Sequence, residues 1–239
     1  DGTSKVTDPS PGNKFCFNRE DSKIITGIGI AYVDQKLNDK YNISIRVYTN
    51  DRKSIQDYAI IGKSGCGKST LLNMIGLLDS PDSGEIILFG EKGIKPFSKK
   101  ATLLLKSKIG YLFQNFALIE NKTVYENLQM AINEKNNKTV NKYIEDALKK
   151  VGLNGYSKKY IYECSGGEQQ RIALARLLVK PCELILADEP TGSLDEENKQ
   201  IVIKLLKEFK KEGCTIIMVT HDIQLAEECD RVIDLNGYR

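Results

Sequence analysis

The sequence has no apolar stretch that could cross a membrane, because none of its hydrophobic runs approaches the roughly 18–20 residues that a spanning helix needs. It begins Asp-Gly-Thr-Ser-Lys and lacks the apolar segment of a secretory signal there, so we expect no signal peptide. The net charge is only +3, and the lysines are spread along the 239 residues instead of being clustered. This charge pattern does not favour a nucleic-acid partner.

The sequence also lacks the spaced cysteines and histidines of a zinc site, since its six cysteines include no Cys-x-x-Cys pair and His221 is its only histidine. Disulfides are not favoured either, because Cys66 and Cys164 lie in loops for which we expect a function. The cysteine pattern therefore predicts a reducing, cytosolic compartment.

A glycine-rich segment at residues 60–73 organises the rest of the sequence, because it contains the phosphate-binding P-loop pattern Gly-x4-Gly-Lys-Ser. Its glycines allow positive φ angles, so that successive backbone N–H groups can point at one anion. Lys68 can reach the β- and γ-phosphates, and the Ser69 hydroxyl can ligate Mg²⁺. An apolar run precedes the loop and a helix pattern follows it, which predicts binding of a nucleoside triphosphate. The predicted binding residues are Gly62, Lys63, Ser64, Gly65, Cys66, Gly67, Lys68, Ser69 and Thr70.

Apolar periodicity predicts strands that alternate with helices, which is typical of a mainly parallel sheet. Strands are expected at residues 23–33, 41–48, 58–61, 85–89, 109–113, 184–187, 215–219 and 232–235. Helices are expected after the P-loop and at residues 97–108, 166–180 and 194–211, with a short one before the last strand. Residues 123–152 have apolar positions at helical spacing and predict two or three inserted helices.

Two acidic residues, Asp188 and Glu189, follow the apolar strand predicted at residues 184–187. Parallel α/β sheets bind ligands at the carboxyl ends of their strands. We therefore interpret Asp188 as a Mg²⁺ ligand and Glu189 as the group that could polarise an attacking water. An ordinary acidic turn is the alternative, and the P-loop upstream favours the catalytic interpretation.

A second predicted anion site is the helix start Cys-Ser-Gly-Gly-Glu-Gln-Gln-Arg at residues 164–171, where Ser165 suits the N-cap. An ordinary capped helix is the alternative. One chain does not need two phosphate sites, unless the second serves the nucleotide of another protomer.

This segment resembles the signature loop of ATP-binding-cassette (ABC) ATPases. Further motifs follow in that family's order: residues 111–114 resemble its Q-loop, residues 191–195 its D-loop, and residues 218–222 its switch histidine. The resemblance covers about residues 59–235 and departs from the family pattern at Cys164, where leucine is usual, and at Glu168, where glutamine is usual. The composition is similar to the branch that serves lipoprotein release, macrolide export and the export of bacteriocins or antimicrobial peptides.

The resemblance implies an α/β fold, with a P-loop NTPase core around a mainly parallel sheet, an N-terminal antiparallel β lobe and an inserted α-helical subdomain. Residues 1–21 lie outside the resemblance, and their many Asp, Ser, Pro, Gly and Asn residues predict a lead-in that is flexible or foreign to the native chain. Residues 22–239 would form a single ABC ATPase domain. Within it, residues 22–115 and 160–239 would make the core and the β lobe, and about residues 116–159 the helical insert.

The resemblance further implies ATP and Mg²⁺ as cofactors and an ATP-dependent, head-to-tail homodimer. The catalytic residues would be Glu189, His221, Gln114 and Lys68, and the Mg²⁺ ligands Ser69, Gln114 and Asp188. The signature residues Ser165, Gly166, Gly167 and Glu168 would face the partner's ATP, and Asp195 would link the two sites. Tyr32 would stack on adenine, with Tyr41 and Tyr48 as competing candidates.

A further implication is a set of separate transmembrane permease subunits docked near residues 116–125, at the cytoplasmic face of the cell membrane. The expected function is ATP hydrolysis that powers export or extraction of a substrate such as a peptide, drug or lipoprotein. The alternative is a soluble, non-transport ABC ATPase for DNA repair or translation. The short segment between Gln114 and Ser165 and the presence of one cassette disfavour it, and the intact Lys68, Asp188, Glu189 and His221 disfavour an inactive binding module.

Overall fold

The computed structural model describes residues 28–37, 40–47, 57–82, 86–192 and 194–237, and for residues 28–37 and 40–47 it describes the backbone alone. The lead-in expected at residues 1–21, the start of the first expected strand and Tyr48 lie outside the described residues. Among the described helices, none is both long and apolar enough to cross a membrane.

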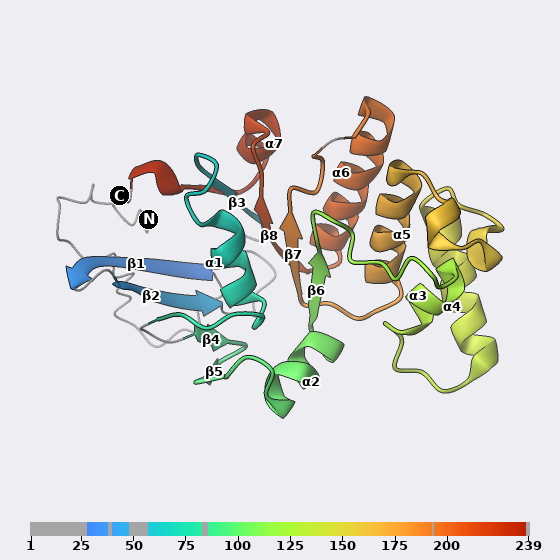
Figure 1. Cartoon of the computed structure of the whole chain (residues 1–239), viewed down its shortest axis with the longest axis horizontal. Helices are drawn as coiled ribbons and strands as arrows, with labels where there is room; N and C mark the ends of the chain where they lie inside the picture. Colours follow the sequence, from blue (N-terminus) through green and yellow to red (C-terminus); the bar gives the residue numbers. More distant parts are fainter. Residues whose placement is uncertain (1–27, 38–39, 48–56, 83–85, 193, 238–239) are drawn as a thin grey trace.

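A parallel five-stranded sheet forms the centre of the described structure (Figure 1). Its order is β6 (Ile109–Leu112), β7 (Leu184–Asp188), β8 (Thr215–Val219), β3 (Asp57–Ile61) and β9 (Arg231–Asp234). All four strand pairings are parallel. The central strands are continuous apolar runs because helices cover both of their faces, which leaves no solvent-exposed side for polar residues. The predicted parallel core is therefore confirmed.

Successive residues of β7 show how the two faces are covered. Ile185 and Ala187 point into the cluster that includes α5 (Gly166–Leu178) and α6 (Glu196–Lys211), whereas Leu184 and Leu186 point into the cluster that includes α1 (Lys68–Ile75) and α2 (Lys99–Ser107). This alternation follows from the two-residue period of a strand. Both faces of the sheet are therefore part of the core.

A smaller sheet of order β1-β2-β4-β5 lies beside α1 (Figure 1). β1 (Ile28–Leu37) and β2 (Lys40–Val47) are antiparallel, as predicted for the N-terminal lobe. β4 (Ile86–Leu88) joins β2 in parallel and turns back into the short β5 (Glu91–Lys92). Phe89 and Gly90, with φ angles of 53° and 77°, form the turn, which is the backbone geometry that two-residue hairpins favour.

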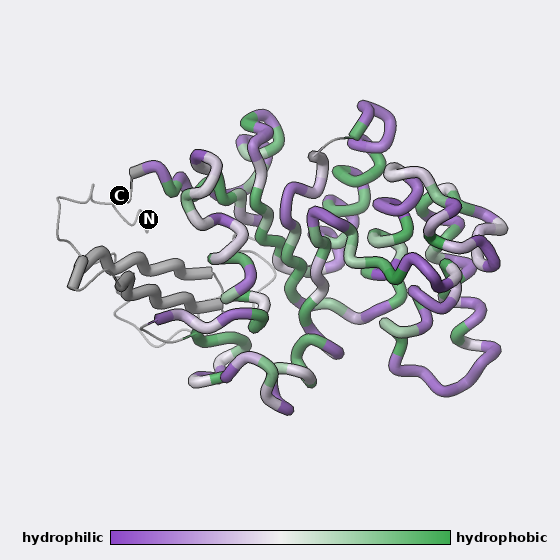
Figure 2. The backbone as a smooth tube through the Cα atoms, in the orientation of Figure 1, coloured by the Kyte–Doolittle hydropathy of each residue, from purple (hydrophilic) through white to green (hydrophobic). Residues whose placement is uncertain are grey.

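Between β6 and α5 the chain forms α3 (Val124–Gln129), α4 (Asn137–Lys150) and the short 3₁₀ turns η1 (Tyr156–Lys158) and η2 (Ile161–Glu163). Asn136 caps α4, and the buried residues Val140, Ile144 and Leu148 repeat at helical spacing on its inner side. This apolar stripe joins the α5–α6 cluster, and hydrophilic residues alternate with the apolar ones along the chain of the helical layer (Figure 2). The sequence predicts two or three helices within residues 123–152, and the structure has two there, α3 and α4.

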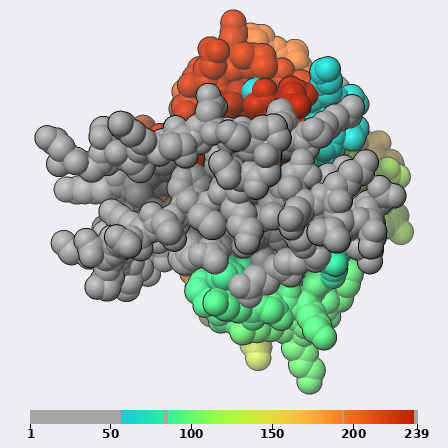
Figure 3. Space-filling view, turned by 90° about the vertical axis from the view of Figure 1, so that its left-hand side faces the viewer, coloured from blue at the N-terminus to red at the C-terminus, as the bar shows by residue number. Residues whose placement is uncertain are grey.

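The helical layer and the β1–β2 pair lie at opposite ends of the molecule (Figure 1). Seen from the β1 end, the C-terminal residues and the residues that follow β4 lie on opposite sides of this face (Figure 3). The last described elements are α7 (Ile223–Glu227), β9 and the 3₁₀ turn η3 (Leu235–Gly237).

Replacing Gly110 of β6 by alanine should destabilise the fold, because α5 crosses this position closely. A Cβ at residue 110 would lie 2.8 Å from both Cys182 Sγ and Leu177 Cδ2. We expect Gly110→Ala to lower the free energy of unfolding by about 1–3 kcal/mol in urea titrations, the usual cost of overpacking. Adding Cys182→Ala should recover part of the loss. Leu103→Ala, at an exposed position, is the control; an equal effect of both single changes would contradict the close approach.

Candidate functional site

The loop between β3 and α1 forms a compact cradle. Gly65 and Gly67 have φ angles of 74° and 97°, which glycine adopts without strain, and Gly67 is the N-cap of α1. The buried Lys68 donates hydrogen bonds from Nζ to the carbonyl oxygens of Gly62, at 2.9 Å, and Lys63, at 3.1 Å. No side chain caps the first turn of α1, and none of its residues is acidic. The positive end of the helix therefore stays available for an anion.

A hydroxyl and a carboxylate meet beside this cradle. Ser69 Oγ donates a hydrogen bond to Asp188 Oδ1 at 3.1 Å, which joins the start of α1 to the end of β7. Gln114 is exposed two residues after β6, and β6 pairs with β7 through Leu112 and Ala187. The Ser69 and Asp188 oxygens fit Mg²⁺, which prefers hard oxygen ligands and binds few protein groups. Gln114 lies on the neighbouring strand's side, and no described hydrogen bond joins its side chain to them. In the described part of the chain, no group of three or more His, Cys, Asp or Glu could hold a metal by itself.

Glu189 and His221 form the second pair at this sheet edge. Glu189 Oε2 accepts a hydrogen bond from the backbone N–H of His221 at 3.2 Å, and Oε1 lies 3.1 Å from His221 Nε2. Burial of the Glu189 carboxyl raises its pKa above the ordinary value, although the N–H and charge of His221 and the charge of Lys68 oppose this effect. A carboxylate with a raised pKa is better suited to accept a proton near neutral pH.

Ser165 caps α5, as predicted. Its Oγ accepts the N–H of Glu168, while Glu168 Oε2 accepts the N–H of Ser165 at 2.7 Å, which completes a capping box. The hydroxyl of Tyr156 donates to Glu168 Oε1 at 2.6 Å, and Lys159 Nζ lies 3.3 Å from Oε2. These contacts lower the pKa of Glu168 to about 2, with the Tyr156 hydrogen bond as the largest cause. The carboxylate is therefore bound within its own chain.

Three residues that sequence reasoning missed connect α5 to the rest of the site. Gln170 Nε2 donates to the carbonyl oxygen of Pro190, and Arg171 donates to Asn198 Oδ1. Asn198 in turn donates to Asp195 Oδ2 at 2.7 Å. Gln170 and Arg171 lie inside the signature segment, but their partners are 20 and 27 residues away. No local pattern in the sequence indicates these pairs.

Most of the predicted residues thus fall into two groups in the described structure, and Gln114 has no described contact with either group. Lys68, Ser69, Asp188, Glu189 and His221 meet at the carboxyl ends of β3, β7 and β8. Ser165 and Gly167 stand at the start of α5, and no described hydrogen bond joins them to the P-loop of the same chain. Tyr32 lies in β1, but its side chain is outside the described structure.

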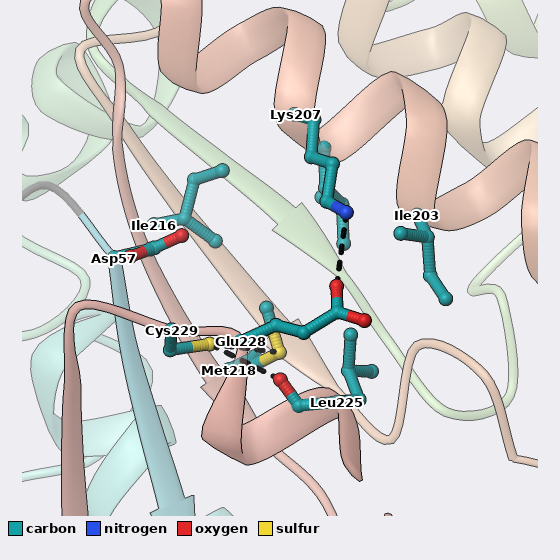
Figure 4. A pocket seen from close by; sticks show the side chains of 9 residues that line it. Asp57, Ile203, Lys207, Ile216, Met218, Leu225, Glu228 and Cys229 are labelled. Atoms are coloured by element: carbon teal, nitrogen blue, oxygen red, sulfur yellow. Dashed lines mark hydrogen bonds and ion pairs between the residues drawn. The ribbon is translucent and has the colours of Figure 1, made fainter.

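A separate small pocket lies among α6, α7 and the strands β3 and β8 (Figure 4). Its lining is mainly apolar, and the ion pair between Lys207 and Glu228, at 2.9 Å, lies within it. It contains none of the predicted site residues.

Comparison with known proteins identifies the relatives of this chain. The family described as ABC transporter matches residues 42–192. The macrolide export ATP-binding/permease protein MacB of Mannheimia succiniciproducens is 39% identical over 81% of this chain, which spans only 30% of that protein's length. An uncharacterised ABC transporter ATP-binding protein of Methanocaldococcus jannaschii is 39% identical over 74% of this chain and 80% of its own length.

Solved structures give a consistent result. A dimeric post-hydrolysis state of the ATP-binding cassette MJ0796, bound to ADP and Pi, matches with a TM-score of 0.72 and 31% identity, covering 87% of this chain and 91% of the other. The protein cbiO1 of Clostridium perfringens, part of the ABC transporter complex cbiONQ, matches with a TM-score of 0.62 and 32% identity over 75% and 72% of the two chains.

Replacing Glu168 by glutamine should destabilise the protein at neutral pH and less so in acid. Folding lowers the pKa of Glu168 from 4.5 to about 2, so its ionised form stabilises the fold above about pH 4.5, and this contribution disappears as the pH falls toward 2. We expect Glu168→Gln to lower the free energy of unfolding at pH 7 by about 1.5–3 kcal/mol, the usual range for hydrogen bonds to a charged group. Urea titrations at pH 7 and pH 3 measure the difference.

The matched control is Glu145→Gln, on the exposed side of α4, which should have little effect at either pH. A Glu168→Gln effect that stays constant between the two pH values would contradict the assigned role of the charge.

Proposed function

Because this chain belongs to the ABC transporter family, we propose that it is the subunit that binds and hydrolyses ATP to drive a membrane transporter. The observation that carries the proposal is the meeting of Lys68, the Ser69–Asp188 pair and the Glu189–His221 pair at one sheet edge. These are the groups that hydrolysis of a nucleoside triphosphate requires. The names of the relatives favour transport over a role in DNA repair or translation.

In this proposal the P-loop holds the triphosphate of ATP. Lys68 exchanges its two loop carbonyl partners for the β- and γ-phosphates, and the backbone N–H groups at Ser64 and Thr70 complete the cradle with those of the glycines. The N–H groups of Lys63 and Cys66 donate to Asn236 Oδ1 and to Lys63 O in this structure, so they would join the cradle by exchanging those partners. Ser69, Asp188 and Gln114 would hold Mg²⁺, which supplies charge neutralisation at the phosphate oxygens when bound. Tyr32 remains our candidate for stacking on adenine.

Hydrolysis then depends on Glu189 and His221. Glu189 accepts a proton from the attacking water, and its raised pKa supports this role. His221 contacts the γ-phosphate and keeps the Glu189 carboxylate in place through its backbone N–H. Gln114, two residues after β6, would sense the occupied site and connect it to the helical layer.

A second copy of the chain completes each site. Ser165, Gly166 and Gly167 would face the γ-phosphate bound by the partner protomer, because a helix start with free N–H groups attracts anions. Glu168 supports this surface by holding the signature loop through its capping box. Asp195 would link the two sites. The dimeric cassette structures among the matched proteins support this arrangement.

We further propose one ABC ATPase domain at residues 22–239, with about residues 116–159 as its helical insert. The insert and the neighbouring η2 turn expose Ile119, Tyr160 and Tyr162, and the two tyrosine rings stack with centroids 5.3 Å apart. Ile119 lies within the segment 116–125, and Tyr160 and Tyr162 are joined to it through Thr123 and Glu120. Permease subunits would therefore dock here, at the cytoplasmic face of the membrane. The macrolide export relatives favour an exporter of a peptide, drug or lipoprotein.

Replacing Glu189 by glutamine should abolish hydrolysis and preserve ATP binding, because the amide keeps the shape of the carboxylate and cannot act as a base. We expect the turnover number to fall by at least about 100-fold. Light scattering should show a dimer that forms with ATP and Mg²⁺ and dissociates without them.

Glu183→Gln is the matched control, since Glu183 precedes the same strand at the far edge of the sheet and pairs with Lys108. Retained turnover in Glu189→Gln would refute the proposed base. A chain that fails to bind ATP would refute the proposed function itself.

Replacing Ile119 and Tyr162 by serine should disrupt docking without affecting the ATPase activity of the isolated chain. The loss of exposed apolar contacts should reduce the recovered complex by at least about 10-fold, equivalent to about 1.4 kcal/mol. The measurement is co-purification from detergent-solubilised membranes, with the captured membrane-spanning protein identified by mass spectrometry. Tyr143→Ser, at a similarly exposed position on α4, is the control. Unchanged recovery of the complex would contradict the docking site.

A further inference from the structure

Gln170 is a buried polar residue in the second turn of α5, with only 2% of its surface exposed. Its Nε2 donates to the carbonyl oxygen of Pro190, which directly follows Glu189 in the chain. Pro190 is itself buried and has no N–H of its own. The Gln170 side chain is therefore a direct connection from α5 to the turn that carries Glu189.

The backbone of Glu189 needs such a restraint. Its φ angle is +48°, a left-handed conformation that is strained for glutamate, and a residue before proline is further restricted. Two backbone hydrogen bonds hold the strained residue, one from Glu189 N–H to Val219 O at 2.9 Å and one from Gly192 N–H to Glu189 O at 3.0 Å. Neither bond involves the peptide between Pro190 and Thr191. The bond from Gln170 to the Pro190 carbonyl oxygen holds that peptide.

The oxygen of the Gln170 amide supports the interpretation that the side chain is present for its bond to Pro190. Its Oε1 is buried and has no hydrogen-bond partner among the described residues. Burying an amide with one end unpaired is unfavourable, so an apolar residue of similar size would suit this position better for packing alone. The bond from Nε2 to Pro190 is the feature that only a donor at this position provides.

We infer that Gln170 is a positioning residue that holds the Glu189 turn in its strained conformation and thereby couples the signature helix to the catalytic carboxylate of the same chain. The inference rests on the proposed function, because it assigns regulation to that site. The start of α5 would face the partner's ATP, and one turn later the same helix holds Pro190. The bonds from Arg171 to Asn198 and from Asn198 to Asp195 tie the helix to the start of α6 as well. Closure onto the partner's nucleotide would thus set the position of Glu189.

The test uses Gln170→Met and Gln170→Glu in the full chain. Both keep the size of the side chain and remove the neutral amide donor. We expect the turnover number for ATP to fall by about 10–100-fold while KM for ATP stays within about twofold, because displacing a catalytic group affects the reaction more than ground-state binding. Amide hydrogen exchange at residues 189–192 should accelerate by about 10-fold in the nucleotide-free protein, where the lost bond no longer closes the turn.

Gln200→Leu is the matched control, because Gln200 is an exposed glutamine on α6 whose Nε2 bonds to Glu196 on its own helix. It should leave turnover and exchange unchanged. Unchanged exchange at residues 189–192 in both Gln170 variants would overturn the inference whatever the activity. Faster exchange with normal turnover would also overturn it, leaving Gln170 a purely structural role. A wild-type chain that hydrolyses no ATP would instead refute the proposed function, and the exchange result would still decide whether Gln170 holds the turn.

Discussion

The parallel pairing of β3, β7 and β8 is the constraint on which the candidate site depends. Val219 pairs with Asp188 on one side and with Ile60 on the other, so the three strands end side by side. The P-loop leaves β3 there, the acidic pair ends β7, and the segment with His221 leaves β8. Ser69 and Asp188 are 119 residues apart in sequence and still share a hydrogen bond. Strand pairing, which buries apolar runs on both faces, thus brings polar groups together at a place where ligands can reach them.

Residues with unusual backbone conformations lie at these carboxyl ends of the strands, and the conformational strain differs among them. Gly65 and Gly67 take positive φ angles with little strain, because glycine has no Cβ. Glu189 takes one at a cost of about 1–3 kcal/mol, which persists only where surrounding contacts hold it. Three hydrogen bonds surround it. The Glu189 N–H donates to Val219 O, the Gly192 N–H donates to Glu189 O, and Gln170 Nε2 donates to Pro190 O. The backbone of Glu189 is therefore strained at the residue whose carboxylate faces His221, where a fixed position of the side chain matters more than local stability.

The sequence predicts elements better than contacts, and the reason is physical. The strand expected at residues 215–219 is β8 with those bounds, and the helix expected at 97–108 is α2 at 99–107, capped by Ser98. Apolar periodicity and capping residues are local, so they can be read directly. The two-residue β5, the strand order and the bond between Gln170 and Pro190 depend on residues that meet only after folding. No spacing of residues in the sequence indicates these three features. The roles assigned to the motif residues, and to Tyr32 in particular, stay predictions.

The departures from the family's signature pattern are compensated locally. Glutamine is usual where this chain has Glu168, but a neutral amide has one acceptor oxygen, whereas a carboxylate has two. Three donors converge here: the Ser165 N–H, the Tyr156 hydroxyl and the Lys159 ammonium group. A carboxylate can satisfy all of them, and its charge in the first turn of α5 is favoured by the helix dipole. Cys164 is buried in the core cluster, where a small apolar side chain replaces the usual leucine. With both changes present, Ser165 still caps α5, so the chain keeps the helix start that would face a second protomer's phosphate.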